Sequence, residues 1–267
     1  MLYATLLRKA VANLGLPYGA EHSFKLIKGA LLQNRFLLTL HISAFGSDPQ
    51  EAIRCFIKPF NMPESFLATL ATPLSYANII HLGYEQNGQN EQLKLYLEFA
   101  ADTITAVEIG TVADEAMLVH VAYKWDPHNP SRRTTAYYHY QPGLGRAKVA
   151  ERVAGLFAER QQMPSRFTQQ LIAKTAHSVP EDGLLLLEVS EEGNPRRSFD
   201  LKLYDAEWPL ALIEPELMLL FDYFQLPREQ LALLMKEHSN KVLGHLSGGI
   251  GRDDREFITL YFGVEEC

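Results

Sequence analysis

Two short stretches of the sequence place a lysine and a tyrosine two residues apart, each within a strict alternation of polar and apolar residues. They are Gln92–Phe99 and Ser198–Tyr204. Alternate side chains of an extended strand lie on one face. The polar faces therefore carry Lys94, Tyr96 and Glu98 in the first stretch and Asp200, Lys202 and Tyr204 in the second. Lysines beside tyrosines suit an anion that carries an apolar group, although two ordinary surface strands would show the same alternation.

Three further segments with strand character add more basic and aromatic residues. They are Met117–Trp125, Thr134–Tyr140 and Arg255–Phe262. His120 and Lys124 share one face of the first of these segments. In the second, the more polar face consists of Thr135, Tyr137 and His139, with Tyr138 and Tyr140 on the other face. The last segment aligns Arg255, Phe257, Thr259 and Tyr261. If these faces converge, they form a ring of tyrosines that also holds several lysines and arginines.

Such a ring has a specific chemical use. Cationic side chains hold a diphosphate through charge-assisted hydrogen bonds, and aromatic faces stabilise a carbocation while excluding the water that would capture it. These are the requirements of prenyl transfer. A purely structural role for the same residues competes with prenyl transfer, because tyrosines can fill the interior of a wide barrel while lysines extend to its rim.

Two carboxylates lie on the same faces and are candidates for catalytic acid–base work. Glu98 and Asp200 could each remove a proton from an acceptor. Each could equally be paired with its neighbouring lysine, and we favour that pairing for Asp200. The sequence has no Asp-Asp-x-x-Asp run of the kind that binds diphosphate through magnesium, and Asp253-Asp254 is typical of a hairpin turn.

Ten segments of strand character carry these residues. The segments follow one another in pairs, and helices separate one pair from the next. The predicted strands are Phe24–Lys28, Arg35–Ser43, Asn78–Glu85, Gln92–Phe99, Met117–Trp125, Thr134–Tyr140, Leu184–Ser190, Arg197–Tyr204, Val242–Ser247 and Arg255–Phe262. The predicted helices are Leu2–Leu14, a helical section from Asp48, Ser65–Leu70, Gly145–Gln161, Pro164–Ala176, Pro215–Tyr223 and Pro227–Ser239. The order repeats an α-β-β-α unit.

This order predicts an α+β fold in which an antiparallel β-barrel is surrounded by helices. Closing the sheet removes its exposed edges, and helices then cover the aliphatic outer faces while the polar faces line the lumen. No linker or change of composition interrupts the sequence, so we expect residues 1–267 to form a single barrel domain.

Composition restricts the class of protein. Hydrophobic residues make up 47% and charged residues 21%, as in compact globular proteins. The net charge of −7 argues against a nucleic-acid partner, so any anion site must be local.

Cys55 and Cys267 form neither a disulfide framework nor a zinc motif, which favours the cytoplasm. No segment is long and apolar enough to span a membrane. The histidines show no metal-binding spacing, so we expect no metal ligands.

The sequence resembles the aromatic prenyltransferases of the ABBA barrel class, and within them the cyanobactin prenyltransferases, which act on ribosomally made peptides. The resemblance lies in the order of elements, in Ser23–Lys28 with Arg35–Leu38, in Glu91–Leu97 and in the run from Leu243 to Gly263. It implies dimethylallyl diphosphate as donor, a magnesium ion, and a diphosphate cradle of lysine, arginine and tyrosine. On the matching strands, these residues are Lys94, Tyr96, Lys202, Tyr204 and Tyr261.

The resulting hypothesis is a prenyltransferase that moves a dimethylallyl or geranyl group to a side chain of a peptide, which is expected to be cyclic, or to a small aromatic acceptor. Lys94, Lys124 and Lys202 would bind the diphosphate, and the aromatic shield would consist of Tyr96, Tyr137, His139, Tyr204 and Tyr261. The alternative is a non-catalytic barrel that binds an isoprenoid or another apolar ligand, or a partner protein of such a pathway. The sequence leaves the acceptor atom, the donor length and the oligomeric state open.

Overall fold

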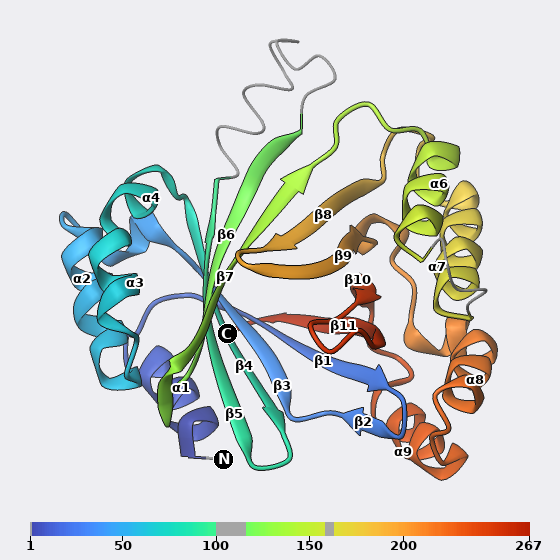
Figure 1. The fold of residues 1–267 in the computed structure, drawn as a ribbon, viewed down its shortest axis with the longest axis horizontal. Helices are drawn as coiled ribbons and strands as arrows, with labels where there is room; N and C mark the ends of the chain where they lie inside the picture. The colour runs from blue at the N-terminus through green and yellow to red at the C-terminus, as the bar shows by residue number, and fades with distance from the viewer. Residues whose placement is uncertain (1, 100–115, 158–162) are drawn as a thin grey trace.

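The computed structural model describes residues 2–99, 116–157 and 163–267, in which ten antiparallel strands close into a barrel (Figure 1). Each strand pairs with the next one along the ring, and the last strand returns to pair with the first. The strands of the ring are β1 (Gly19–Ile27), β3 (Arg35–His41), β4 (Ile79–Asn87), β5 (Asn90–Glu98), β6 (Met117–Asp126), β7 (Asn129–Tyr140), β8 (Leu185–Glu191), β9 (Asn194–Lys202), β10 (Leu243–Ile250) and β11 (Glu256–Glu266). The short β2 (Ala30–Leu32), which was not predicted, extends the sheet beside β1.

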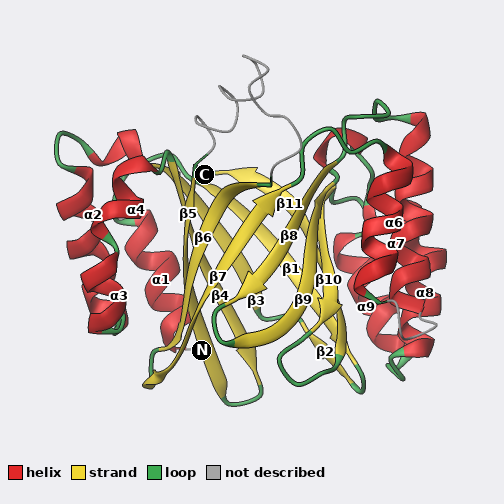
Figure 2. Ribbon diagram, turned by 45° about the horizontal axis from the view of Figure 1, so that its top comes forward, coloured by secondary structure: helices red, strands yellow, loops and turns green. Residues whose placement is uncertain are grey.

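Helices cover the barrel on two opposite sides (Figure 2). On one side lie α1 (Leu2–Ala12), α2 (Pro49–Ile57), α3 (Glu64–Thr69) and α4 (Ala71–Tyr76). On the other side lie α6 (Arg146–Leu156), α7 (Met163–Lys174), α8 (Glu214–Tyr223) and α9 (Arg228–His238). Residues 158–161 of the predicted helix Gly145–Gln161 lie outside the described residues. None of the described helices combines the length and the apolar character needed to cross a membrane.

The hydrophobic core lies outside the barrel, between its wall and the helices. On β5, Leu93, Leu95 and Leu97 are buried in a cluster with the side chains of α1 to α4. A second cluster joins β9, β10 and β11 to α6 through α9. Most wall strands therefore bury their apolar residues outward and turn their alternate, polar residues toward the lumen. β8 is an exception, because its Leu187 and Val189 lie on the lumen side in a small apolar cluster with Ala122, Ala136 and Tyr138. The predicted fold class is confirmed.

Local sequence signals account for several element boundaries. The Asp48 side chain accepts a hydrogen bond from the Glu51 amide at 3.1 Å, which caps α2, and Gly88 turns the β4–β5 hairpin with a φ of +59°. The predicted strands leave the residues between Trp125 and Thr134 outside the sheet, but β7 begins at Asn129. Asp126 accepts hydrogen bonds from two following amides, which shortens this connection to a tight turn.

The predicted lumen face of β7 is wrong. Cross-strand partners share a face of the sheet, and the register pairs His120 with Tyr138 and Val121 with Tyr137. His120 and Tyr138 therefore face the lumen, whereas Tyr137 packs against the core under α1 to α4. His139 has the parity of Tyr137 and is likewise placed on the outer face. The alternation within this strand was ambiguous because aromatic residues occur at both parities.

Candidate functional site

A cavity of about 380 Å³ occupies the barrel end where hairpin turns meet. Its rim includes Asn87 and Asn90 from the β4–β5 hairpin and Gly251 from the β10–β11 connection. The basic side chains that line it are Lys25, Arg35, Lys94, Lys124, Arg196, Arg252 and Arg255. We call this space the cationic cavity.

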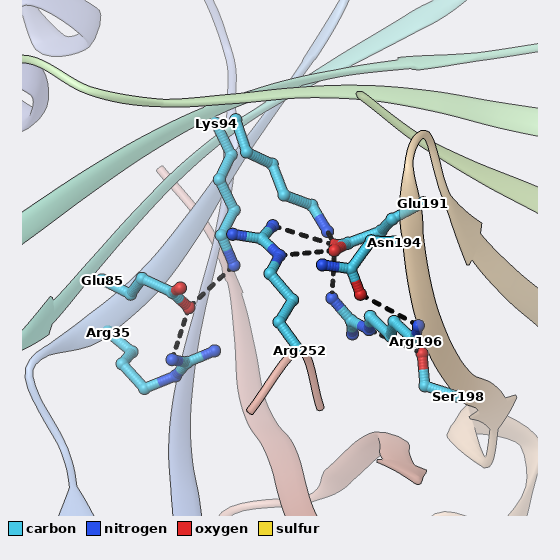
Figure 3. Close-up of polar contacts among 9 residues, drawn as sticks. Arg35, Glu85, Lys94, Glu191, Asn194, Arg196, Ser198 and Arg252 are labelled. Atoms are coloured by element: carbon cyan, nitrogen blue, oxygen red, sulfur yellow. Dashed lines mark hydrogen bonds and ion pairs between the residues drawn. The ribbon is translucent and has the colours of Figure 1, made fainter. Parts of the chain in front are cut away.

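Glu85 joins two of these cations on neighbouring strands (Figure 3). Its Oε2 accepts a hydrogen bond from Lys94 Nζ at 2.7 Å and is ion-paired with Arg35. Burial alone would raise the pKa of Glu85, but Arg35, Lys94 and Lys25 hold that pKa well below its ordinary value. Glu85 is therefore ionised and holds both cationic side chains in place.

Glu191 joins three further cations in the same way (Figure 3). Its Oε1 accepts from Lys124 Nζ at 2.9 Å, from Arg196 Nη1 at 2.6 Å and from Arg252 Nη2 at 3.0 Å. Burial opposes ionisation of Glu191, yet its cationic partners lower the pKa of this carboxyl below the ordinary value. The second carboxylate thus gathers side chains from β6, β9 and the β10–β11 connection.

Positive charge exceeds negative charge in the cationic cavity. Among the described residues, seven cations line it, while the carboxylates that line it or bind its cations are Glu85, Glu191 and Asp253. Burial lowers the pKa of Lys25 to about 7 and that of Lys94 to about 8, with neighbouring cations adding to both shifts. Such a crowded group of cations favours an entering polyanion, which would relieve their mutual repulsion.

Tyrosines separate the cationic cavity from the rest of the lumen. Tyr96, Tyr138 and Tyr261 line both compartments. The rings of Tyr96 and Tyr138 meet edge to face at 5.8 Å between centroids. Burial raises the pKa of Tyr96 well above its ordinary value and that of Tyr261 to about 12, so both phenols are neutral. The boundary is therefore aromatic and uncharged.

A smaller space of about 100 Å³ lies beyond these tyrosines, and we call it the inner cavity. Two groups of carboxylates and imidazoles line it. In the first group, Glu98 Oε2 lies 2.7 Å from His81 Nε2 and 3.7 Å from His120 Nδ1, and His81 Nδ1 lies 2.8 Å from Thr39 Oγ1. Burial raises the pKa of Glu98, but His81 and His120 outweigh that effect and bring it to about 2.

The second group surrounds His245. Its Nδ1 lies 2.8 Å from Asp200 and its Nε2 lies 3.3 Å from Glu21, which also accepts the hydroxyl of Tyr204 at 3.0 Å. Burial would lower the pKa of His245, but the two carboxylates raise it to about 10, so this imidazole is protonated at neutral pH. Its ring stacks on Tyr261 with centroids 3.8 Å apart. We expected Asp200 to pair with its neighbouring lysine, but the structure pairs it with His245.

The structure divides the predicted site residues among three places. Lys94 and Lys124 line the cationic cavity, and Tyr96 and Tyr261 lie at its boundary. The inner cavity holds Glu98, Asp200, Lys202 and Tyr204. Tyr137 and His139 lie on the outer face of β7, away from both cavities. Lys202 is thus separated from the cations with which we grouped it, and its diphosphate-binding role stays a prediction that this placement does not favour.

Sequence reasoning missed several residues of the two cavities. Arg35, Glu85, Arg196 and His245 lie on predicted strands or beside them, and the same parity argument would have found Arg35 with Thr39 and Glu85 with His81. Arg252 belongs to a connection whose position at the cavity rim has no signal in the sequence. The charge pairs across strands depend on the register, which local alternation does not reveal.

Comparison with solved structures identifies the fold. The structure of 5-dimethylallyltryptophan synthase from Streptomyces coelicolor is similar with a TM-score of 0.58 and 15% sequence identity, over 91% of this chain and 80% of that chain. The prenyltransferase PriB, in a ternary complex with L-tryptophan and dimethylallyl thiolodiphosphate, gives a TM-score of 0.60 at 14% identity, over 91% and 79%. The NotF prenyltransferase gives 0.55 at 12%, over 91% and 80%. No family model and no curated protein matches the sequence.

These likenesses show that the chain has the ABBA barrel fold, as the resemblance in the sequence implied. At such low identity they do not transfer an activity, because one fold can host several functions. The function must be argued from the two cavities of this chain.

Proposed function

We propose that this protein is a prenyltransferase that moves a short isoprenoid from its diphosphate to a nucleophilic side chain. The observation that carries the proposal is the position of a cationic cavity directly beside a neutral aromatic boundary, inside a closed barrel. The similar structures include enzymes with dimethylallyl diphosphate analogues and tryptophan in their complexes, which supports the same chemistry here.

In this proposal the cationic cavity binds the diphosphate of the donor. The carbon–oxygen bond of the allylic diphosphate breaks, and the bonding electrons leave with the diphosphate, whose developing charge Lys94, Arg35 and the side chains around Glu191 stabilise. The allylic cation then lies against Tyr96 and Tyr138. The buried aromatic boundary keeps water from capturing this cation before the acceptor does.

The acceptor enters through the inner cavity. Attack of an aromatic carbon on the allylic cation forms the new carbon–carbon bond and leaves a proton on the ring, which a base must remove. We assign that role to Glu98, because it lies next to Tyr96 on the lumen face of β5, whereas Asp200 is neutralised by the protonated His245. A carboxylate with a pKa of about 2 remains a sufficient base for a proton as acidic as that of an arenium ion.

The size of the inner cavity limits how much of an acceptor can enter it. Its volume of about 100 Å³ suits one side chain rather than a folded peptide, so we propose that a peptide outside the barrel inserts a single aromatic or other nucleophilic residue. A free aromatic amino acid would fit the same space. The proposal of a ribosomally made peptide rests on the sequence resemblance to the cyanobactin prenyltransferases.

Magnesium, which the resemblance implies, stays a prediction. Mg²⁺ prefers oxygen ligands, and the carboxylates that line the cationic cavity or bind its cations, among the described residues, are Glu85, Glu191 and Asp253. Each of them is ion-paired with lysine or arginine, and the excess of positive charge already balances a diphosphate. The cationic cavity therefore does not fit a resident Mg²⁺, and we assign no step to one.

Mass spectrometry tests the proposed function. The protein is incubated with dimethylallyl or geranyl diphosphate, with and without magnesium, together with linear and cyclic peptides that contain each nucleophilic side chain, and with free tryptophan and tyrosine. We expect a product whose mass increases by one or two isoprene units, and its formation should depend on Lys94. Donor binding without product would favour the non-catalytic alternative, and the absence of donor binding would contradict the proposed prenyltransferase.

A further inference from the structure

Three side chains on adjacent strands bring metal-ligand atoms together in the inner cavity. The atoms offered by His81, Glu98 and His120 all lie within 4.8 Å of one another. Glu98 on β5 is the direct cross-strand partner of His120 on β6, and His81 lies on β4. These residues are far apart in sequence and have none of the spacings that identify metal motifs, which is why the sequence predicted no metal ligands.

One ligand atom of this group is buried without a hydrogen-bond partner. His120 is 8% exposed, and its Nδ1 has no hydrogen-bond partner among the described residues. A buried polar atom without a partner is destabilising and requires an explanation. The nearest carboxylate oxygen, Glu98 Oε2, lies 3.7 Å away, which is too long for a hydrogen bond but suits two ligands of one ion.

A further side chain would orient the first histidine. Thr39, the cross-strand partner of His81, places Oγ1 2.8 Å from His81 Nδ1. A hydroxyl can donate or accept, so Thr39 can hold either tautomer of this imidazole, including the one that leaves Nε2 free to bind a metal. Such an outer hydrogen bond is characteristic of metal-binding histidines.

We propose that His81, Glu98 and His120 bind one divalent transition-metal ion inside the barrel. Two imidazole nitrogens and one carboxylate oxygen form a ligand set of catalytic zinc and of similar first-row ions, not of magnesium or calcium. In a tetrahedral site with bonds of about 2.1 Å, ligand atoms lie about 3.4 Å apart. The observed separations of 2.7 Å and 3.7 Å from Glu98 Oε2 bracket that value.

The site has a chemical consequence that rests on the proposed function. A metal bound here leaves a coordination position open toward the inner cavity, where an acceptor hydroxyl or thiol could bind. The ion would stabilise the deprotonated heteroatom, and the released proton would pass to solvent. Glu98 would then be a ligand rather than a base, so metal loading would favour oxygen or sulfur acceptors over aromatic carbon.

Metal binding is measured without donor or acceptor, so its result is independent of the proposed function. The exposed thiols are first removed in a Cys55→Ser, Cys267→Ser background, because they could bind metal themselves. Metal-free protein is then titrated with Zn²⁺ by calorimetry and with Co²⁺ by visible absorption. We expect one ion per chain, and loss of the Co²⁺ absorption in His81→Asn, Glu98→Gln and His120→Asn. His139→Asn, which alters a histidine on the outer face of β7, is the matched control and should bind normally.

A milder variant keeps the test interpretable if the ligand variants fail to fold. Thr39→Val removes the outer hydrogen bond but no ligand, and we expect it to weaken Zn²⁺ binding by about 10- to 100-fold. Circular dichroism verifies the fold of every variant. The proposal is overturned if the parent protein binds no ion, or if folded ligand variants bind as tightly as the control does.

Discussion

At the scale of single residues, the lumen separates two lysines that the sequence places in equivalent patterns. Lys94 lines the cationic cavity and binds Glu85, whereas Lys202 lines the inner cavity on the other side of the tyrosines. The same Lys-x-Tyr pattern therefore serves two environments, because the two strands bring it to different depths of the barrel.

The two lysines are expected to differ in their effect on donor binding. Lys94→Ala removes a charge-assisted hydrogen bond of about 1.5 to 3 kcal/mol, which corresponds to a loss of about 10- to 100-fold in donor affinity. Lys202→Ala, the matched variant, should change that affinity by less than about threefold, because its charge lies beyond the tyrosines. Calorimetric titration with a non-hydrolysable donor analogue measures both. Equal losses would place the diphosphate elsewhere in the lumen.

Protonation of the cavity lysines should make donor binding depend on pH. Burial lowers the pKa of Lys25 to about 7 and that of Lys94 to about 8. Both amines are charged below these values and lose their charge as the pH rises through them, so donor affinity should fall over that range. Binding isotherms at several pH values test this. A Lys25→Arg, Lys94→Arg variant, whose guanidinium groups stay protonated, should lose most of the pH dependence.

At the scale of elements, the register of β6 and β7 decides which tyrosine faces the lumen. Tyr138 is the partner of His120 and lines both cavities, whereas its neighbour Tyr137 packs against the helices. Strand alternation limited the choice to one of two faces. The pairing with β6, which depends on contacts distant in the sequence, determined the face.

This register can be tested through the fate of the allylic cation. Tyr138→Leu removes an aromatic face worth about 2 kcal/mol in a desolvated site, so turnover should fall about 30-fold. A larger share of the donor should end as the free prenyl alcohol, because water gains access. Tyr137→Leu, on the outer face, should keep the ratio of alcohol to prenylated product unchanged. Chromatography of both products measures that ratio, and the reverse result would invert the assigned faces.

At the scale of the whole molecule, the two sides of the barrel wall have different roles. The outer side packs into the hydrophobic core, and the inner side lines the cavities. The outer leucines of β5 are buried against helices, while its inner residues belong to the site. Leu95→Ala should therefore reduce the free energy of unfolding by about 2 to 5 kcal/mol. Thermal or denaturant unfolding measures this, and a loss below about 1 kcal/mol would contradict the role of the outer core.

The charged lumen should carry a cost in stability. The Lys25 amine lies over the Phe257 ring at 4.2 Å, and its pKa of about 7 lies below the value of an unfolded lysine. Between these values the unfolded chain binds more protons, so the contribution of Lys25 makes stability rise with pH. Lys25→Met should remove that contribution and, near neutral pH, raise Tm by about 2 to 4 °C while weakening donor binding. A lower Tm in this variant would show that the amine stabilises the barrel.

Local alternation and turn signals were enough to predict the ten strands, most of the helices between them and a polar face on most strands, because each depends on residues close together in the sequence. The helix α4 was not predicted. The predicted strand ends differ where side chains such as Asp126 tighten a turn. The grouping of Arg35, Lys94 and Glu85, the pairing of Asp200 with His245, and the convergence of His81, Glu98 and His120 join residues from separate strands. Their proximity follows from strand register and barrel closure, which emerge only when the sheet assembles.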